Sequence, residues 1–133
     1  MQGQCTVLVA AGALEERRTL LQILDALSIN SFGSSGLQEA LEVLSQRPID
    51  LVFCDERLQD GSYRDLLRAA RTNPNRPRVV VTIRTRERDD YLEARRLGAY
   101  DAIRFPVVAT DVELLLLQAM HESGEKRADR LTV

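Results

Sequence analysis

The chain has 133 residues, of which 44% are hydrophobic and 29% charged, and its formal net charge is −2. These values predict one soluble globular domain and exclude a disordered chain. No stretch approaches the roughly 18 apolar residues of a membrane span, so we expect a cytoplasmic protein without a membrane partner. The negative charge argues against a nucleic-acid-binding surface, although nearly all of the basic residues are Arg.

The two cysteines, Cys5 and Cys54, each lie inside an apolar run. A cysteine in that setting usually acts as a small buried hydrophobe in a reducing compartment. We therefore expect no disulfide.

The first half of the chain predicts two strand-helix units and the start of a third. Residues 6–10 form an apolar, β-branched run typical of a strand that is buried on both faces. Helical spacing of leucines predicts a helix over 14–27, and residues 31–35 follow as a short edge strand. A second helix begins at Leu37 and ends before Pro48.

The second half continues the alternation. The run at 49–54 predicts a strand ending at Asp55, and a turn at Asp60-Gly61 precedes a helix. The remaining expected segments are a strand at 79–83, a charged helix at 87–97, a strand at 100–105 and a helix at 110–121. We assign 1–122 to the domain and 123–133 to a polar C-terminal tail or the start of a linker.

Five apolar strands alternating with five helices predict an α/β fold with a doubly wound parallel sheet. Such sheets bind ligands beyond the carboxyl ends of their strands. Asp55 stands at such an end and is the one evident nucleophile, since a carboxylate in a dry cleft can accept a phosphoryl group. An Asp there more often caps the next turn, and Thr82, which could bond a phosphoryl oxygen, is also an ordinary strand residue.

In order and spacing, these features resemble the receiver domains of two-component response regulators. The similar segments are SINSFGSSGLQEALEVL, PIDLVFCDERLQDG, VVVTI and LGAYDAIRFP, within about residues 5–120. The resemblance implies a flavodoxin-like, five-stranded sheet of order 2-1-3-4-5 and a role in phosphorelay signal transduction. It also implies that the domain is not an enzyme.

Several positions keep the family pattern. The resemblance makes Asp55 the candidate phosphoacceptor and Thr82 the hydroxyl that hydrogen-bonds the phosphoryl group. It also implies that the backbone carbonyl of Arg57 coordinates Mg²⁺ and that Asp60 and Gly61 form the turn before the third helix. Finally, it predicts a cis peptide bond before Pro106.

Other positions depart from the pattern. Ala11 and Gly12 stand where the family has the acidic pair that binds Mg²⁺, Phe105 stands in place of its Lys, and Ala102 in place of its aromatic switch. Mg²⁺ needs hard oxygen ligands, so we expect no cofactor at this site, although the family uses Mg²⁺. Arg104 points to the opposite face of the strand from Phe105 and does not replace the Lys.

Charged residues near Asp55 leave two alternative hypotheses for the site open. Glu15, Glu16 and Glu56 could form a rearranged metal site, which would let Asp55 work as a phosphoacceptor, but acids in a first helical turn usually complement the helix dipole. Arg84 could instead hold a small anion near Asp55, as in an anion-binding α/β domain.

The last predicted helix carries Leu114 and Leu117 on its outward side. Two exposed leucines three positions apart suit a homodimer through the fourth helix, last strand and last helix, a surface similar to the family's signalling face. We interpret the chain as a degenerate receiver that signals through protein contacts. A histidine kinase or an output domain is the expected partner, and the sequence identifies neither.

Overall fold

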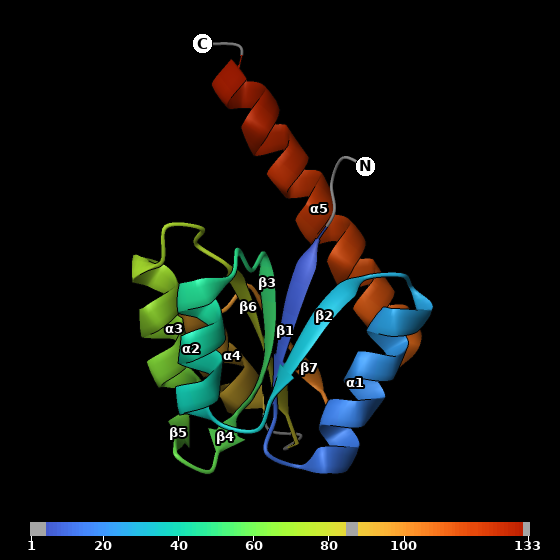
Figure 1. The fold of residues 1–133 in the computed structure, drawn as a ribbon, viewed down its shortest axis with the longest axis vertical. Helices are drawn as coiled ribbons and strands as arrows, with labels where there is room; N and C mark the ends of the chain where they lie inside the picture. The colour runs from blue at the N-terminus through green and yellow to red at the C-terminus, as the bar shows by residue number, and fades with distance from the viewer. Residues whose placement is uncertain (1–4, 85–87, 132–133) are drawn as a thin grey trace.

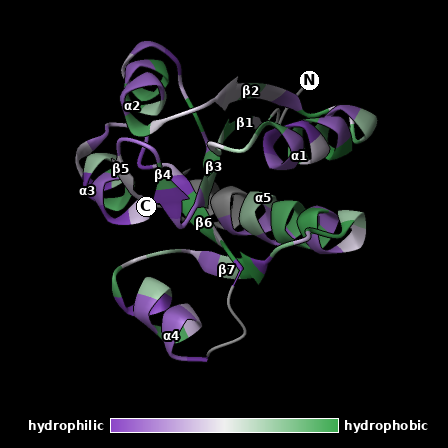
Figure 2. Cartoon of the chain, turned by 90° about the horizontal axis from the view of Figure 1, so that it is seen from below, coloured by the Kyte–Doolittle hydropathy of each residue, from purple (hydrophilic) through white to green (hydrophobic). Residues whose placement is uncertain are grey.

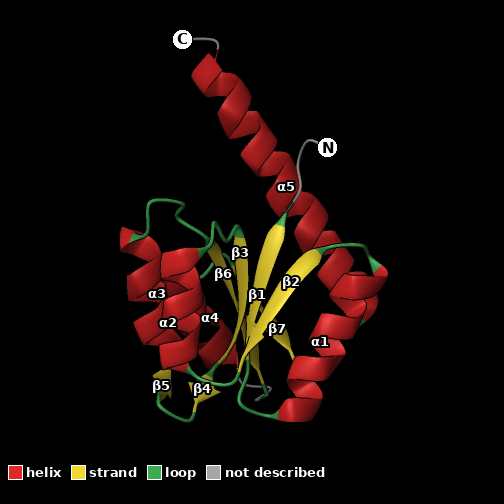
Figure 3. Cartoon of the chain, viewed as in Figure 1, coloured by secondary structure: helices red, strands yellow, loops and turns green. Residues whose placement is uncertain are grey.

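A five-stranded parallel sheet runs through the middle of the molecule (Figures 1 and 3). The structure is a computed structural model that describes residues 5–84 and 88–131. The sheet strands are β1 (Thr6–Ala10), β2 (Asn30–Ser34), β3 (Leu51–Asp55), β6 (Arg78–Ile83) and β7 (Asp101–Arg104). Their order is β2-β1-β3-β6-β7, which confirms the predicted order. Two short strands, β4 (Arg57–Leu58) and β5 (Gly61–Ser62), form a separate antiparallel pair.

Helices cover both faces of the sheet. Seen from below, α1 (Leu14–Ala26) and α5 (Ala109–Leu131) lie on one face, and α2 (Leu37–Gln46), α3 (Tyr63–Thr72) and α4 (Arg88–Arg96) lie on the other (Figure 2). Parallel neighbours need a crossover connection, and the intervening helices supply it.

The core is divided by the sheet into two clusters. Val7 and Val9 of β1 pack with α1 and α5, whereas Leu8 and Ala10 pack with the helices of the opposite face. Successive side chains of a strand point to opposite faces, so a strand covered on both sides must be apolar at every position. This explains the runs without polar alternation in β1, β3 and β6.

Asp60 links the hairpin of β4 and β5 to the start of α2. Its carboxylate accepts hydrogen bonds from the backbone N–H groups of Leu37 (2.6 Å) and Gln38 (3.0 Å). These bonds, led by the one from Gln38, lower the pKa of Asp60 below its ordinary value. A Cβ at Gly36 would lie 2.8 Å from the carboxylate, so the close approach requires glycine.

The C-terminal segment departs from the prediction. Residues 123–133 were expected to form a polar tail, but α5 continues to Leu131 and projects past the sheet (Figure 1). Glu, Lys, Arg and Ala favour helix, and a single glycine costs only about 1 kcal/mol in a helix, so Gly124 does not end it. The other predicted bounds agree within two residues, and Glu87, the expected start of the fourth helix, lies outside the described residues.

Within the described part of the chain, no helix is both long and apolar enough to span a membrane. Cys5 and Cys54 are free and buried. Burial, and secondarily the charge of Asp50, raises the pKa of the Cys5 thiol to about 11.

Candidate functional site

The last residue of β3 and a residue near the end of β6 form the floor of the candidate site. Asp55 and Thr82 are direct partners in the register of these parallel strands, and each is 4% exposed. The backbone N–H of Glu56 donates to the carbonyl of Thr82 at 3.0 Å, which extends the pairing one residue beyond β3. These two positions, which match the family pattern, thus lie side by side at the carboxyl edge of the sheet.

Arg84 pairs with both oxygens of Asp55. Its Nη1 donates to Oδ1 and its Nη2 donates to Oδ2, each at 2.9 Å. Such a fork of two parallel N–H···O bonds is the strongest common pairing of a guanidinium with a carboxylate. The Asp55 side chain is 5% exposed, whereas the Arg84 side chain is 44% exposed, so the guanidinium lies between the carboxylate and solvent.

Glu16 and Glu56 also bind Arg84. Nη2 donates to Oε2 of Glu16 as well as to Asp55, and the backbone N–H of Arg84 donates to Oε1 of Glu56 at 3.0 Å. Hydrogen bonds with Asp55 and then with Glu16 raise the pKa of Arg84 above its ordinary value. The site therefore contains a permanent cation that belongs to the chain itself.

These contacts correct two expectations. Sequence reasoning assigned Glu16 to the helix dipole, but the structure brings it from the first turn of α1 to the guanidinium. Arg84 was considered as a ligand for a bound anion, yet its partners are two carboxylates of the same chain. The sequence carried a signal for this contact, because an acid after β1 and a base after β6 both lie beyond the carboxyl ends of the two strands that flank β3.

The positions that depart from the family pattern contribute no charge. Ala11 is buried and its carbonyl accepts a hydrogen bond from Nη1 of Arg17 at 2.7 Å, while Gly12 is half-buried. Phe105 places its ring 5.7 Å from Cζ of Arg84. The Phe105-Pro106 bond is cis, the geometry that the resemblance predicted. Ala102 is buried within β7.

The side chains present do not fit Mg²⁺. The acidic pair that binds Mg²⁺ in the family pattern is replaced by Ala11 and Gly12, and both oxygens of Asp55 accept hydrogen bonds from Arg84. Nowhere in residues 5–84 and 88–122, where side chains are described, do three or more His, Cys, Asp or Glu residues group closely enough to hold a metal ion.

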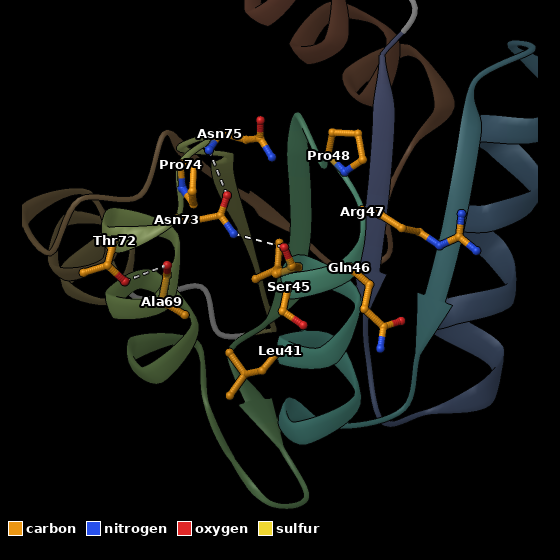
Figure 4. A pocket seen from close by; sticks show the side chains of 11 residues that line it. Leu41, Ser45, Gln46, Arg47, Pro48, Ala69, Thr72, Asn73, Pro74 and Asn75 are labelled. Carbon is orange, nitrogen blue, oxygen red and sulfur yellow. Dashed lines mark hydrogen bonds between the residues drawn. The ribbon is translucent and has the colours of Figure 1, made fainter.

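A hollow of about 570 Å³ lies between the C-terminal ends of α2 and α3 (Figure 4). The Asn73 amide closes one side by donating to the carbonyl of Leu44 at 3.0 Å, and Asn73 Oδ1 accepts from the backbone N–H of Asn75 at 2.9 Å. Arg47 is the one charged residue among those that line the hollow, and its guanidinium lies over the ring of Phe32. The Asn73 side chain thus joins the ends of α2 and α3 beside the hollow.

Comparisons with known proteins point to one family. The chain is 33% identical over 92 residues to the response regulator protein PilR of Pseudomonas aeruginosa, a match that covers 68% of this chain and 20% of that protein. The chain thus spans about a fifth of the curated relative it matches. No family model matches the sequence.

Solved structures share the fold. NtrX from Brucella abortus superimposes with a TM-score of 0.87 and 25% identity, over 96% of this chain and 29% of that one. The signal receiver domain of a LuxO repressor protein from Vibrio parahaemolyticus gives 0.85 and 16% identity, over 94% and 96% of the two chains. Fold, strand order and sequence agree with the resemblance. This chain belongs to the receiver domains of response regulators.

Proposed function

We propose that this receiver domain is degenerate and acts in two-component signalling through protein contacts, without accepting a phosphoryl group on Asp55. The observation that carries the proposal is the fork between Arg84 and both oxygens of Asp55. A carboxylate must present a free oxygen to attack phosphorus, and the developing charge needs a neutralising metal. The engagement of both Asp55 oxygens by Arg84 and the lack of acidic side chains at Ala11 and Gly12 support the proposal that Asp55 does not meet these requirements.

We also propose that the domain is non-enzymatic and cytoplasmic and that it signals by binding other proteins. A co-crystal structure shows the phosphotransfer protein Ypd1 of Saccharomyces cerevisiae with the receiver domain of Ssk1. For this chain, we take a histidine kinase or an output domain as the class of protein partner. Because Arg84 engages both oxygens of Asp55, we expect such a partner to recognise the surface of the domain.

We propose a second copy of the chain as one such partner. Leu114 and Leu117 of α5 are 55% and 59% exposed, and Leu92 of α4, a helix that contacts β7, is 47% exposed. We place a homodimer contact on the surface formed by α4, β7 and α5, because exposed leucines there would be removed from water by a two-fold partner.

The proposal is tested by incubating the protein with acetyl phosphate, with and without Mg²⁺, and measuring its intact mass. We expect no gain of a phosphoryl group under either condition. Asp55→Ala is the matched control. A Mg²⁺-dependent gain that disappears in Asp55→Ala would show that the domain is a working phosphoacceptor with an unconventional metal site.

A further inference from the structure

Arg84 connects three segments that meet beyond the carboxyl ends of the strands. Its guanidinium binds Asp55 at the end of β3 and Glu16 in α1, and its backbone N–H binds the side chain of Glu56. We name these four residues the strand-end latch. A single side chain thus ties the start of α1 and the end of β3 to the residue after β6.

The latch joins a partly exposed guanidinium to carboxylates that are largely buried. Asp55 and Glu16 are 5% and 15% exposed at their side chains, so separating them from Arg84 would leave two poorly solvated carboxylates facing one another. The ring of Phe105, 5.7 Å from the guanidinium carbon, adds an attractive aromatic surface and no competing charge. Removing the cation is therefore costly for the folded state.

A bound divalent cation would do similar work at this place, because it too would neutralise carboxylates that arrive from different segments. Here a guanidinium does so, and its charge is covalently attached to the chain. We propose that Arg84 is a built-in replacement for Mg²⁺ that holds these strand ends in one arrangement whether or not the metal is present. This proposal rests on the proposed function and explains how the site persists without a metal.

The test is a double-mutant cycle on the full chain, followed by thermal unfolding in EDTA and in excess Mg²⁺. The wild-type midpoint is expected to be the same in both. Arg84→Gln leaves the carboxylates without a cationic partner and is expected to lower the unfolding midpoint by about 5 °C. Adding Asp55→Asn to Arg84→Gln removes one stranded charge, so the double variant recovers part of that loss.

Arg64→Gln is the matched control. Arg64 pairs with Glu93 at 2.8 Å, but both side chains are more than a third exposed, so its loss should move the midpoint by no more than about 2 °C. Arg84→Lys keeps the charge without the fork and should fall between wild type and Arg84→Gln.

Two results would overturn the latch: additive effects of Arg84→Gln and Asp55→Asn, or a wild-type midpoint that rises with Mg²⁺. Additive effects of the two substitutions, found together with no uptake of phosphate, would reject the latch but not the proposed function. Uptake of phosphate by the wild type, with coupling between Arg84 and Asp55 intact, would reject the proposed function instead.

Discussion

Arg84 supplies the cation of the site, and the uncharged ring of Phe105 lies beside it. In the family pattern the cation comes from a Lys at the position of Phe105, whereas here it comes from Arg84, whose Cζ lies 5.7 Å from the Phe105 ring. A second cation at position 105 would repel the guanidinium, and an aromatic ring attracts it. The lost lysine and the new arginine are therefore compatible parts of one arrangement.

Single residues differ in how far the sequence could predict them. Asp55 and Thr82 could be placed because each closes an apolar run, and the losses at Ala11, Gly12, Phe105 and Ala102 follow from aligning a motif. The binding partners of Arg84 could not be predicted in this way. They depend on side-chain directions in three segments that meet only in the folded chain.

Arginine side chains also bind backbone carbonyls away from the site. Nη groups donate to the carbonyls of Ala11, Leu97 and Ala119, from Arg17, Arg71 and Arg78 respectively. Ala11 follows the end of β1 and Leu97 the end of α4, where carbonyls lack partners within their own element, whereas Ala119 lies inside α5. A planar guanidinium on a long side chain can reach all three carbonyls. Such contacts explain part of the arginine bias without a nucleic-acid partner.

The helix α2 depends on an acid outside itself. Its N-cap, Gly36, has no side chain to accept a bond, and Asp60 accepts from Leu37 and Gln38 instead. The sequence predicted the turn at Asp60 but not this contact, because the hairpin and the helix start are separate along the chain. Element boundaries were predictable where proline or a change of periodicity marks them, and failed in α5, where helix-forming residues continue the helix.

Asp60→Ala should destabilise the domain at neutral pH, because two backbone donors of α2 lose their acceptor. The folded-state pKa of Asp60 is lowered, so its stabilisation is complete above the unfolded pKa and is lost as pH falls through the folded pKa. In urea unfolding, the midpoint of the variant should lie below that of the wild type at pH 7. The difference should shrink as pH falls below the ordinary range of aspartate, near 3.8.

Asp60→Asn provides the control, since its amide oxygen can still accept one of the two bonds without a titrating charge. Its midpoint should lie between those of wild type and Asp60→Ala at pH 7. A difference between wild type and Asp60→Ala that stays constant from pH 7 into strong acid would disprove the role of the carboxylate.

At the scale of the molecule, the fold was the most predictable feature. Uninterrupted apolar strands separated by amphipathic helices admit few arrangements other than a parallel sheet covered on both faces. The observed order β2-β1-β3-β6-β7 matches the expectation once the β4-β5 pair is left out. Self-association is a different kind of question, because hydrophobic periodicity gives orientation and not affinity.

Leu114→Lys combined with Leu117→Lys should abolish the proposed dimer, because two charges would have to be buried in the contact. Both leucines are more than half exposed, so the double variant should still fold. Sedimentation velocity would measure the change from dimer to monomer. Leu14→Lys is the matched control, because Leu14 is 53% exposed on α1, away from the proposed surface. A monomeric wild type at high concentration would rule out the dimer.

The central claim is that Arg84 closes the site on Asp55, and the guanidinium N–H signals of Arg84 in a ¹⁵N–¹H NMR spectrum test it most directly. A guanidinium held by a forked ion pair rotates slowly, so its Nη–H groups should give separate signals. The loss of these signals in Arg84→Lys assigns them to Arg84. In Asp55→Asn, where the ion pair is removed, the separate signals should merge. We predict that these signals persist unchanged when Mg²⁺ and acetyl phosphate are added together. Their disappearance or a large shift on that addition would contradict the account, because it would mean that Asp55 leaves Arg84 to bind the metal or to take up phosphate.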